Sequence, residues 1–420
     1  MAPSLSALRT RLARAAAGLI LVGLGRPVRA ATETAPPVGL HWGPLSVAPS
    51  LATGLFASTN PFNRSDASVQ GGESTGDVIA VLNPAVMATL PFRNSWFRLA
   101  YDGVFRNYAN DVTASNNSQD VQADLALRFS SFDQLTFAYD RQRGAADTIR
   151  FDGGEAIYDG TPYGFVTYDV SVQREVPGHL GYAANVRWSR LTFESTTYAF
   201  FEYDGWDGAF ELRKAVSASK WILAGGAFRR FDHRLANDPT HSVYRQEVVD
   251  AVQVGMQGFG AHSQSWRVML RYDWADYPGG TGSDFSGLGG EALLILAPGP
   301  SSNVYLYASR RNWASFYIDN NYYVATVAGV RGEKRWNRTA IGLDVNLGLT
   351  DYPDVVVDPV SQEAIKRRDV GSRGEFYASF AFRSAYALRV SFSHQGRRSN
   401  AGGVDYRGDA LGVQFVLGWR

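Results

Sequence analysis

The sequence contains no cysteine, only six histidines and, after its first thirty residues, no long apolar run. The lack of cysteine excludes disulfide bonds, a cysteine metal site and a lipid anchor attached through cysteine. The histidines are spaced too irregularly to suggest a metal site, and no glycine-rich phosphate loop opens a helix. A helix that crosses a bilayer needs about 20 apolar residues. We therefore expect neither a transmembrane helix nor a cofactor.

Residues 1–30 have the composition of a cleaved signal peptide. Three arginines precede an apolar run at 15–24, and residues 28–30 (Val-Arg-Ala) carry small residues at a cleavage site. The apolar run is too short to span a bilayer, although an uncleaved anchor is the alternative. These thirty residues hold five arginines and no acid, so their removal changes 41 basic and 40 acidic residues into 36 and 40. A net charge of −4 does not favour nucleic-acid binding.

The rest of the chain shows hydrophobic residues at every second position, as in a strand with two different faces. The clearest case is the segment 266–274. One face carries Trp266, Val268, Leu270, Tyr272 and Trp274, and the other carries Arg267, Met269, Arg271 and Asp273. High aromatic and glycine contents (21 Tyr, 24 Phe, 10 Trp and 43 Gly) with slightly negative mean hydropathy fit a membrane barrel, because only alternate residues face lipid.

About eighteen such segments can be delimited, each long enough to cross a bilayer as a tilted strand of roughly 9–11 residues. They lie at 45–58, 77–90, 95–108, 118–130, 134–144, 162–175, 180–194, 202–216, 220–233, 246–258, 264–277, 284–297, 301–313, 321–333, 337–351, 372–383, 385–396 and 405–419.

Short connections alternate with long polar ones, which is typical of bacterial outer-membrane barrels. The longest are expected at 59–76, 145–161 and 352–371. We predict an all-β, antiparallel up-and-down transmembrane barrel of 16–18 strands at 45–420. A short periplasmic lead at 31–44 precedes it, and both termini are expected in the periplasm. A large soluble β-sandwich or propeller is the alternative, but no blade-length repeat is visible.

The last segment supports the same interpretation. Leu411, Val413, Phe415, Leu417 and Trp419 alternate up to the end of the sequence. Outer-membrane barrels usually end on such a strand with an aromatic last residue, the signal for the barrel-assembly machinery. Here Arg420 follows Trp419, so the pattern is displaced by one position.

Several short stretches resemble the β-barrel porin type-2 family, the outer-membrane barrels encoded with exopolysaccharide clusters. They are 47–51 (VAPSL), 60–66 (NPFNRSD), 81–85 (VLNPA), 99–101 (LAY), 107–108 (NY), 395–400 (QGRRSN) and 404–406 (VDY). The resemblance implies a Gram-negative outer-membrane barrel that exports an exopolysaccharide. It also implies a periplasmic polysaccharide-export protein as partner.

The polar faces of the segments predict the lumen lining. Sugar rings stack on aromatic side chains while their hydroxyls bond to charged groups, so this mixture could form a polysaccharide path. The candidates are Trp96, Arg98, Asp102, Arg106, Asp124, Arg128, Asp140, Arg187, Arg267, Arg271, Asp273, Tyr305 and Tyr307, with Tyr377 and Arg389 in addition. The alternative is that interior Arg–Asp pairs only stabilise the barrel wall and satisfy its polar groups.

Two rival functions remain. A barrel hydrolase would need a nucleophile or water beside a base. The sequence offers only His233 next to Asp232, and His394 after Ser391 and Ser393. Neither has a recognisable signature, so we expect no enzyme. A general or sugar-selective diffusion porin is the second rival, and the loop at 145–161 or 352–371 would be its constriction.

Overall fold

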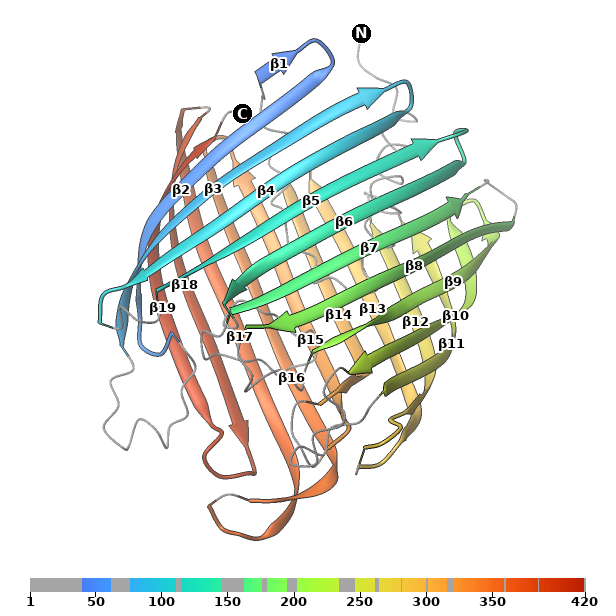
Figure 1. The fold of residues 1–420 in the computed structure, drawn as a ribbon. Coiled ribbons are helices and arrows are strands. Elements are labelled where there is room, and N and C mark those ends of the chain that lie inside the picture. Colours follow the sequence, from blue (N-terminus) through green and yellow to red (C-terminus); the bar gives the residue numbers. More distant parts are fainter. Residues whose placement is uncertain are drawn as a thin grey trace.

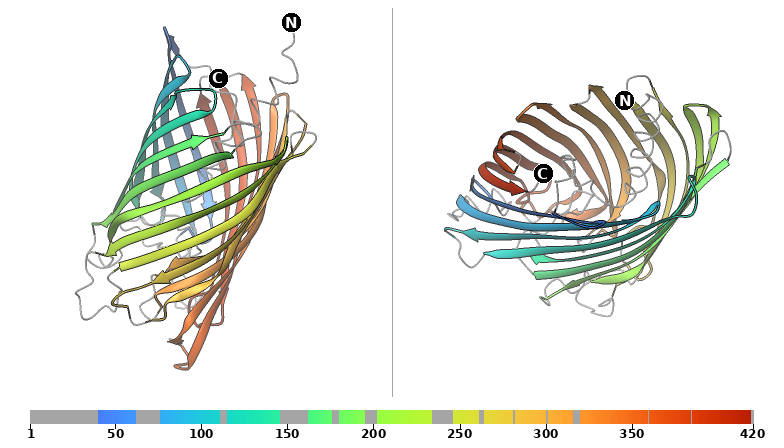
Figure 2. Two further views of the ribbon diagram at one scale, coloured as in Figure 1. Left: turned by 90° about the vertical axis from the view of Figure 1, so that its right-hand side faces the viewer. Right: turned by 90° about the horizontal axis from the view of Figure 1, so that it is seen from above.

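The computed structural model is a closed antiparallel β-barrel (Figure 1). In the described part of the chain, eighteen strands, β2 to β19, each pair with the next, and β19 returns to pair with β2. The short strand β1 (Leu40–Trp42) pairs with the beginning of β2. Viewed from above, the strands form a ring (Figure 2).

The structure describes residues 40–61, 76–110, 115–145, 162–175, 180–194, 202–233, 246–260, 264–280, 282–299, 301–315, 320–358, 360–383 and 385–418. The strands are β2 Leu45–Ser58, β3 Asp77–Phe92, β4 Ser95–Tyr108, β5 Asn116–Arg128, β6 Asp133–Ala145, β7 Pro162–Arg174, β8 Leu180–Phe193, β9 Tyr203–Ser217, β10 Lys220–His233, β11 Gln246–Phe259, β12 Ser265–Asp276, β13 Phe285–Gly299, β14 Ser302–Ala314, β15 Tyr322–Trp336, β16 Thr339–Val357, β17 Ala364–Arg383, β18 Tyr386–Ser399 and β19 Tyr406–Gly418. Over these residues, no helix has the length and hydropathy that crossing a membrane requires.

The two ends of the barrel differ in their connections. At one end, here called the turn end, lie the start of β2, the end of β19 and the short turns (Figure 1). Two of these turns have two residues and place Arg93 (φ 54°) and Asn337 (φ 46°) in the left-handed region. That backbone matches the right-handed twist of the flanking strands. The longer connections lie at the opposite end, the loop end.

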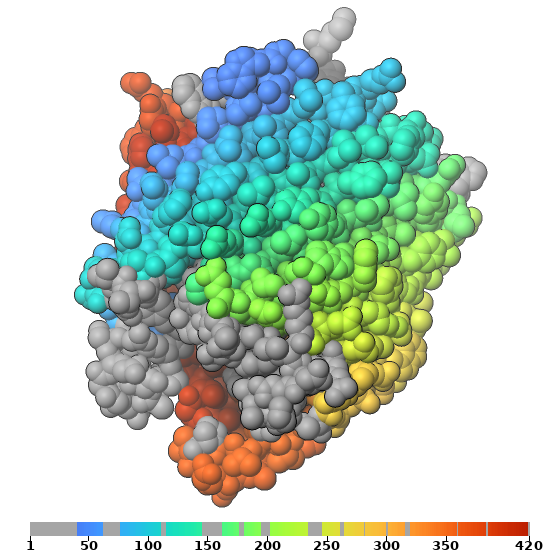
Figure 3. All heavy atoms as spheres, in the orientation of Figure 1, coloured from blue at the N-terminus to red at the C-terminus, as the bar shows by residue number. Residues whose placement is uncertain are grey.

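The outward face of the strands is apolar. Leu270, Leu288, Leu347 and Leu411 are each more than half exposed, and each lies among other exposed aliphatic or aromatic side chains. Figure 3 shows strands from blue to yellow lying edge to edge over one side of this outer surface. A soluble protein rarely exposes so large an apolar surface. The barrel therefore has the outer surface of a membrane protein.

The sequence-based fold is confirmed, with one correction at the β16–β17 hairpin. Outside that hairpin, every strand bound lies within three residues of the expected one. The expected loop at 352–371 is wrong, because β16 continues to Val357 and β17 begins at Ala364. After an irregularity that follows Asp351, Val355–Val357 pair with Ala364–Lys366. Consecutive valines favour a strand, so the hairpin extends beyond its neighbours (Figure 1).

Candidate functional site: the lumen

The lumen face of β8 to β12, here called the charged wall, is built from buried ion pairs within a strand, between neighbouring strands and, from β9 to β12, across two intervening strands. Glu211 accepts hydrogen bonds from Arg213 (2.8 Å) and from Nη1 and Nη2 of Arg267 (3.3 and 2.5 Å). Glu211 and Arg267 are only 5% and 4% exposed although they face the lumen. On the same wall, Arg187 forms two 2.9 Å bonds with Asp207. Such two-point bonding fixes both side chains.

The lumen face of β19, β2 and β3, here called the small-residue wall, has short and mostly uncharged side chains. Its members are Ser50, Ala52, Gly54, Phe56, Ile79, Val81, Asn83, Ala85, Ala410, Gly412, Gln414 and Val416. The Phe56 ring packs closely on Gly412, because a Cβ added there would lie 2.2 Å from it. Most of these side chains are too short to reach far into the lumen.

All the lumen candidates from the sequence fall on the lumen face of their strands. Arg98 donates to Asp124 through Nε (2.9 Å), and Arg271 pairs with Asp273. Two others instead meet neutral partners. Arg106 donates to Asn116 (3.2 Å) and Arg128 to Gln134 (3.1 Å). The remaining ones, Asp102, Asp140, Trp96, Tyr305 and Tyr307, lie on the same face by strand alternation.

Two lumen tyrosines lie flat against glycines of the next strand. A Cβ on Gly329 would lie 2.4 Å from ring atoms of Tyr307, and one on Gly342 would lie 2.2 Å from those of Tyr377. The glycines are therefore needed for the close approach of the rings. The guanidinium of Arg389 stacks on Tyr377 at 3.9 Å from the ring centroid. Tyr307 lies on the lumen face of β14, and its ring covers Gly329 of β15.

A hairpin tip that bends into the lumen is a feature that the sequence did not reveal. Pairing of β13 with β14 stops at Gly290 and Arg310, although β13 extends to Phe285. From there to the loop end, β14 and β15 leave the barrel wall and lie inside it. Their face that would otherwise have met lipid packs against the lumen side of β11–β13. Tyr322 and Val324 there form a buried cluster with Val249, Ala275 and Tyr277.

Polar contacts at the loop end hold this inward hairpin in place. Asp354 of β16 accepts hydrogen bonds from the backbone N–H (3.0 Å) and hydroxyl (2.5 Å) of Ser283. The side chain of Asn320 accepts a bond from the Asp354 N–H (3.0 Å), and that of Asn321 donates to the Ser283 carbonyl (3.2 Å). These bonds join the β12–β13 and β14–β15 connections to each other and to the end of β16.

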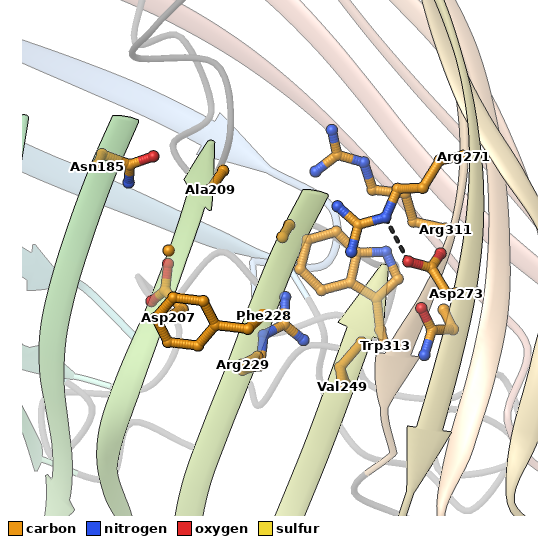
Figure 4. A pocket seen from close by; sticks show the side chains of 13 residues that line it. Asn185, Asp207, Ala209, Phe228, Arg229, Val249, Arg271, Asp273, Arg311 and Trp313 are labelled. Carbon is orange, nitrogen blue, oxygen red and sulfur yellow. Dashed lines mark hydrogen bonds and ion pairs between the residues drawn. The ribbon is translucent and has the colours of Figure 1, made fainter. Parts of the chain in front are cut away.

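The other face of the inward hairpin borders a hollow in the lumen (Figure 4). Trp313 and three arginines, Arg229, Arg271 and Arg311, line it with Asp207 and Asp273. The Arg229 guanidinium lies 5.8 Å from the Trp313 ring centroid and also donates to Glu247 (2.8 Å). Arg311 pairs with Glu291. This hollow combines an aromatic face with several hydrogen-bond donors.

The functional residues that the sequence analysis missed are mainly the carboxylates that pair with the lumen arginines. Glu211, Glu247 and Glu291 sit on the polar faces of their strands, but pairing them with arginines requires the register between strands and the curvature of the wall. The position of Trp313 beside the hollow was not predicted either, because it depends on where β14 leaves β13. The constriction expected at 145–161 falls almost wholly on residues outside the described ranges.

In each of the two histidine sites considered for catalysis, the histidine and its expected partner lie on opposite faces of the strand. His233 faces the lumen, whereas Asp232 faces outward and bonds to Gln246 (2.7 Å). His394 faces outward and lies 2.6 Å from Asp409, whereas Ser391 and Ser393 face the lumen. In the described ranges, no group of three or more acidic or histidine side chains is placed to hold a metal ion.

No family model matches the chain, and no curated protein does. Solved structures with a similar fold include the outer membrane protein OpdK from Pseudomonas aeruginosa, with 12% identity, a TM-score of 0.46, and 89% of this chain and 99% of that chain covered. The FrpB iron transporter from Neisseria meningitidis (F3-3 variant) shows 11% identity and a TM-score of 0.46 over 83% of this chain. The match spans 62% of FrpB. These similarities are remote, and the fold assignment rests on the strand pairing.

Proposed function

We propose that the protein is a Gram-negative outer-membrane channel for export of an exopolysaccharide. The observation that carries the proposal is the lumen, where aromatic rings lie flat against the wall beside charges that are already paired. Tyr307 on Gly329 and Phe56 on Gly412 present ring surface, while pairs such as Arg187 with Asp207 neutralise much of the lumen charge. A sliding chain needs many weak, similar contacts.

The width of the barrel supports transport. About eight strands enclose only side chains, and porins of 16–18 strands leave an aqueous channel. Resemblance of short stretches, such as 60–66 and 395–400, to the porin type-2 barrels supports a polysaccharide as cargo. The polymer path would include the lumen candidates and follow the small-residue wall, where side chains are short.

The proposed orientation places the turn end and both termini in the periplasm. A barrel has no energy source, so synthesis must push the polymer from within. A periplasmic polysaccharide-export protein would deliver it at the short turns, such as Arg93–Asn94. Insertion would follow cleavage of residues 1–30 and recognition of the last strand by the barrel-assembly machinery.

A diffusion porin is the second candidate, and the inward β14–β15 hairpin favours it. A narrowed lumen with Trp313, Arg229 and Arg311 side by side suits a small sugar or carboxylate better than a wide polymer. No observation favours a hydrolase, since each histidine pair considered lies on opposite faces of its strand.

The experiment that separates these functions is a gene deletion with two readouts. For an exporter, released and cell-surface polysaccharide should be lost while uptake of small sugars continues. Complementation with Tyr307→Ala should restore export only in part, and the outward-facing control Leu306→Ala should restore it fully. Normal polymer secretion with loss of growth on one oligosaccharide would show a diffusion porin instead.

A further inference from the structure

The outward face at the loop end of β16 to β19 carries a concentration of positive charge. Lys366, Arg368, Arg398 and Arg407 are all exposed and all point away from the lumen by strand alternation. We call these four residues the basic rim patch. Two carboxylates lie among them, Asp351 at 3.1 Å from Arg368 and Asp409 at 3.3 Å from Arg407. The patch therefore keeps a net positive charge.

The basic rim patch begins where the apolar belt ends. Phe392 and Leu411 are paired, outward-facing and about half exposed. The next outward pairs toward the loop end are His394 with Asp409 and Gly396 with Arg407. Arg398 lies twelve residues beyond Tyr386, the first residue of β18. At roughly 3.3 Å per residue and about 40° tilt, that is about 30 Å along the barrel axis, just past an apolar band about 25 Å tall.

Several other outward arginines toward the loop end have carboxylates that neutralise them, although Arg310 bonds to the hydroxyl of Thr326 instead. Arg190 pairs with Asp204 (3.2 Å) and Arg230 with Asp250 (2.6 Å). By contrast, in the described part of the chain, no carboxylate pairs with Lys366 or Arg398. The basic rim patch is thus a sector, on β16 to β19, where four exposed cations lie together.

We infer that the basic rim patch binds the phosphate groups of a lipid in the leaflet around the loop end. Cationic side chains just outside an apolar belt are placed to meet lipid headgroups, and anionic headgroups attract them. The exposed guanidiniums can bond phosphate oxygens at two points. The inference rests on the proposed orientation, which puts the phosphorylated glycolipid leaflet at the loop end.

The test is lipid binding to the full protein in detergent, measured by native mass spectrometry. The probe is bisphosphorylated lipid A, compared with its dephosphorylated form. The double variant Arg398→Gln/Arg407→Gln should bind lipid A at least about tenfold more weakly. The matched control, Arg190→Gln/Arg230→Gln, removes two outward arginines from the same end and should bind normally. Arg398→Lys/Arg407→Lys should retain most of the binding, which shows that charge is responsible.

Each result decides the point. Equal lipid A binding by the Gln variant and the native protein would overturn the inference, as would equal binding of the dephosphorylated lipid. Competition by soluble polygalacturonate would assign the patch to an emerging acidic polymer instead. Heat-modifiable gel mobility confirms that the variants are folded. Conductance of the same preparations tests the channel separately, so failure of transport and failure of lipid binding are distinguishable.

Discussion

The charged wall and the small-residue wall obey the same alternation of inward and outward residues, yet they differ in what fills them. On the charged wall, long side chains reach across strands and bury one another, as Glu211 of β9 and Arg267 of β12 do at 5% and 4% exposure. On the small-residue wall, Ala52 and Gly54 cannot reach a partner. The charged wall therefore carries a layer of ion-paired side chains on its lumen face, whereas the small-residue wall carries little beyond its backbone. From this difference we expect the free part of the lumen to lie along β19, β2 and β3.

The largest expected effect is on the charged wall. Glu211→Ala leaves Arg213 and Arg267 buried without their shared carboxylate. Breaking a buried ion pair from one side costs about 3–5 kcal/mol. Unfolding in urea, followed by heat-modifiable gel mobility, measures the loss.

Two controls sharpen the contrast. Gln414→Leu on the small-residue wall should change stability by under about 1 kcal/mol, because the residue remains partly exposed. Glu211→Leu combined with Arg267→Met should recover much of the loss, since apolar replacement of a whole pair is often neutral. Equal losses at Glu211 and Gln414 would mean that the two walls do not differ energetically.

The second prediction concerns the free part of the lumen. Ala52→Trp adds a large ring on the small-residue wall and should clearly lower single-channel conductance in planar bilayers. Its control is Ala57→Trp on the same strand, which faces outward and should leave conductance unchanged. If Ala52→Trp conducts as the native protein does, the open path runs elsewhere.

The third prediction concerns the inward hairpin. Trp313→Ala removes the largest side chain at its lumen side and should raise conductance, by less than the loss at Ala52. Trp274→Ala, on the outward face of β12, is the matched control. A conductance that is identical in both variants would show that the hairpin does not narrow the path.

These comparisons also indicate how far the sequence could lead. The barrel and the face of each residue follow from the period-two pattern, so Arg267, Tyr307 and Leu347 were assigned to the correct faces. The pattern gives neither the register nor the curvature of the wall, so the partners Glu211 and Glu291 stayed hidden. The departure of β14 from β13 depends on packing of Tyr322 against β11–β13, a tertiary contact without a local signal. The valines at 355–357 resembled a loop core because Asp and Pro residues surround them.

The smallest expected effect is on the connections above the small-residue wall, where Asp358 joins two loops. Its carboxylate accepts hydrogen bonds from the N–H groups of Gly402 (2.6 Å), Ser361 (2.7 Å) and Val360 (2.7 Å). Backbone bonds, first of all from Gly402, lower the pKa of Asp358 below its usual 3.8. The stabilisation is thus complete above pH 3.8 and is lost as the pH falls through the lower pKa of the folded state. Protection of the Gly402 amide from hydrogen exchange, relative to an unstructured amide at the same pH, should fall only in that acidic range. Asp358→Asn should lower this protection at neutral pH and make it nearly independent of pH, whereas Glu363→Gln, from the same connection, should keep the native profile. A native profile in Asp358→Asn would mean that another group links the loops, and that the rim above the small-residue wall is held in a different way.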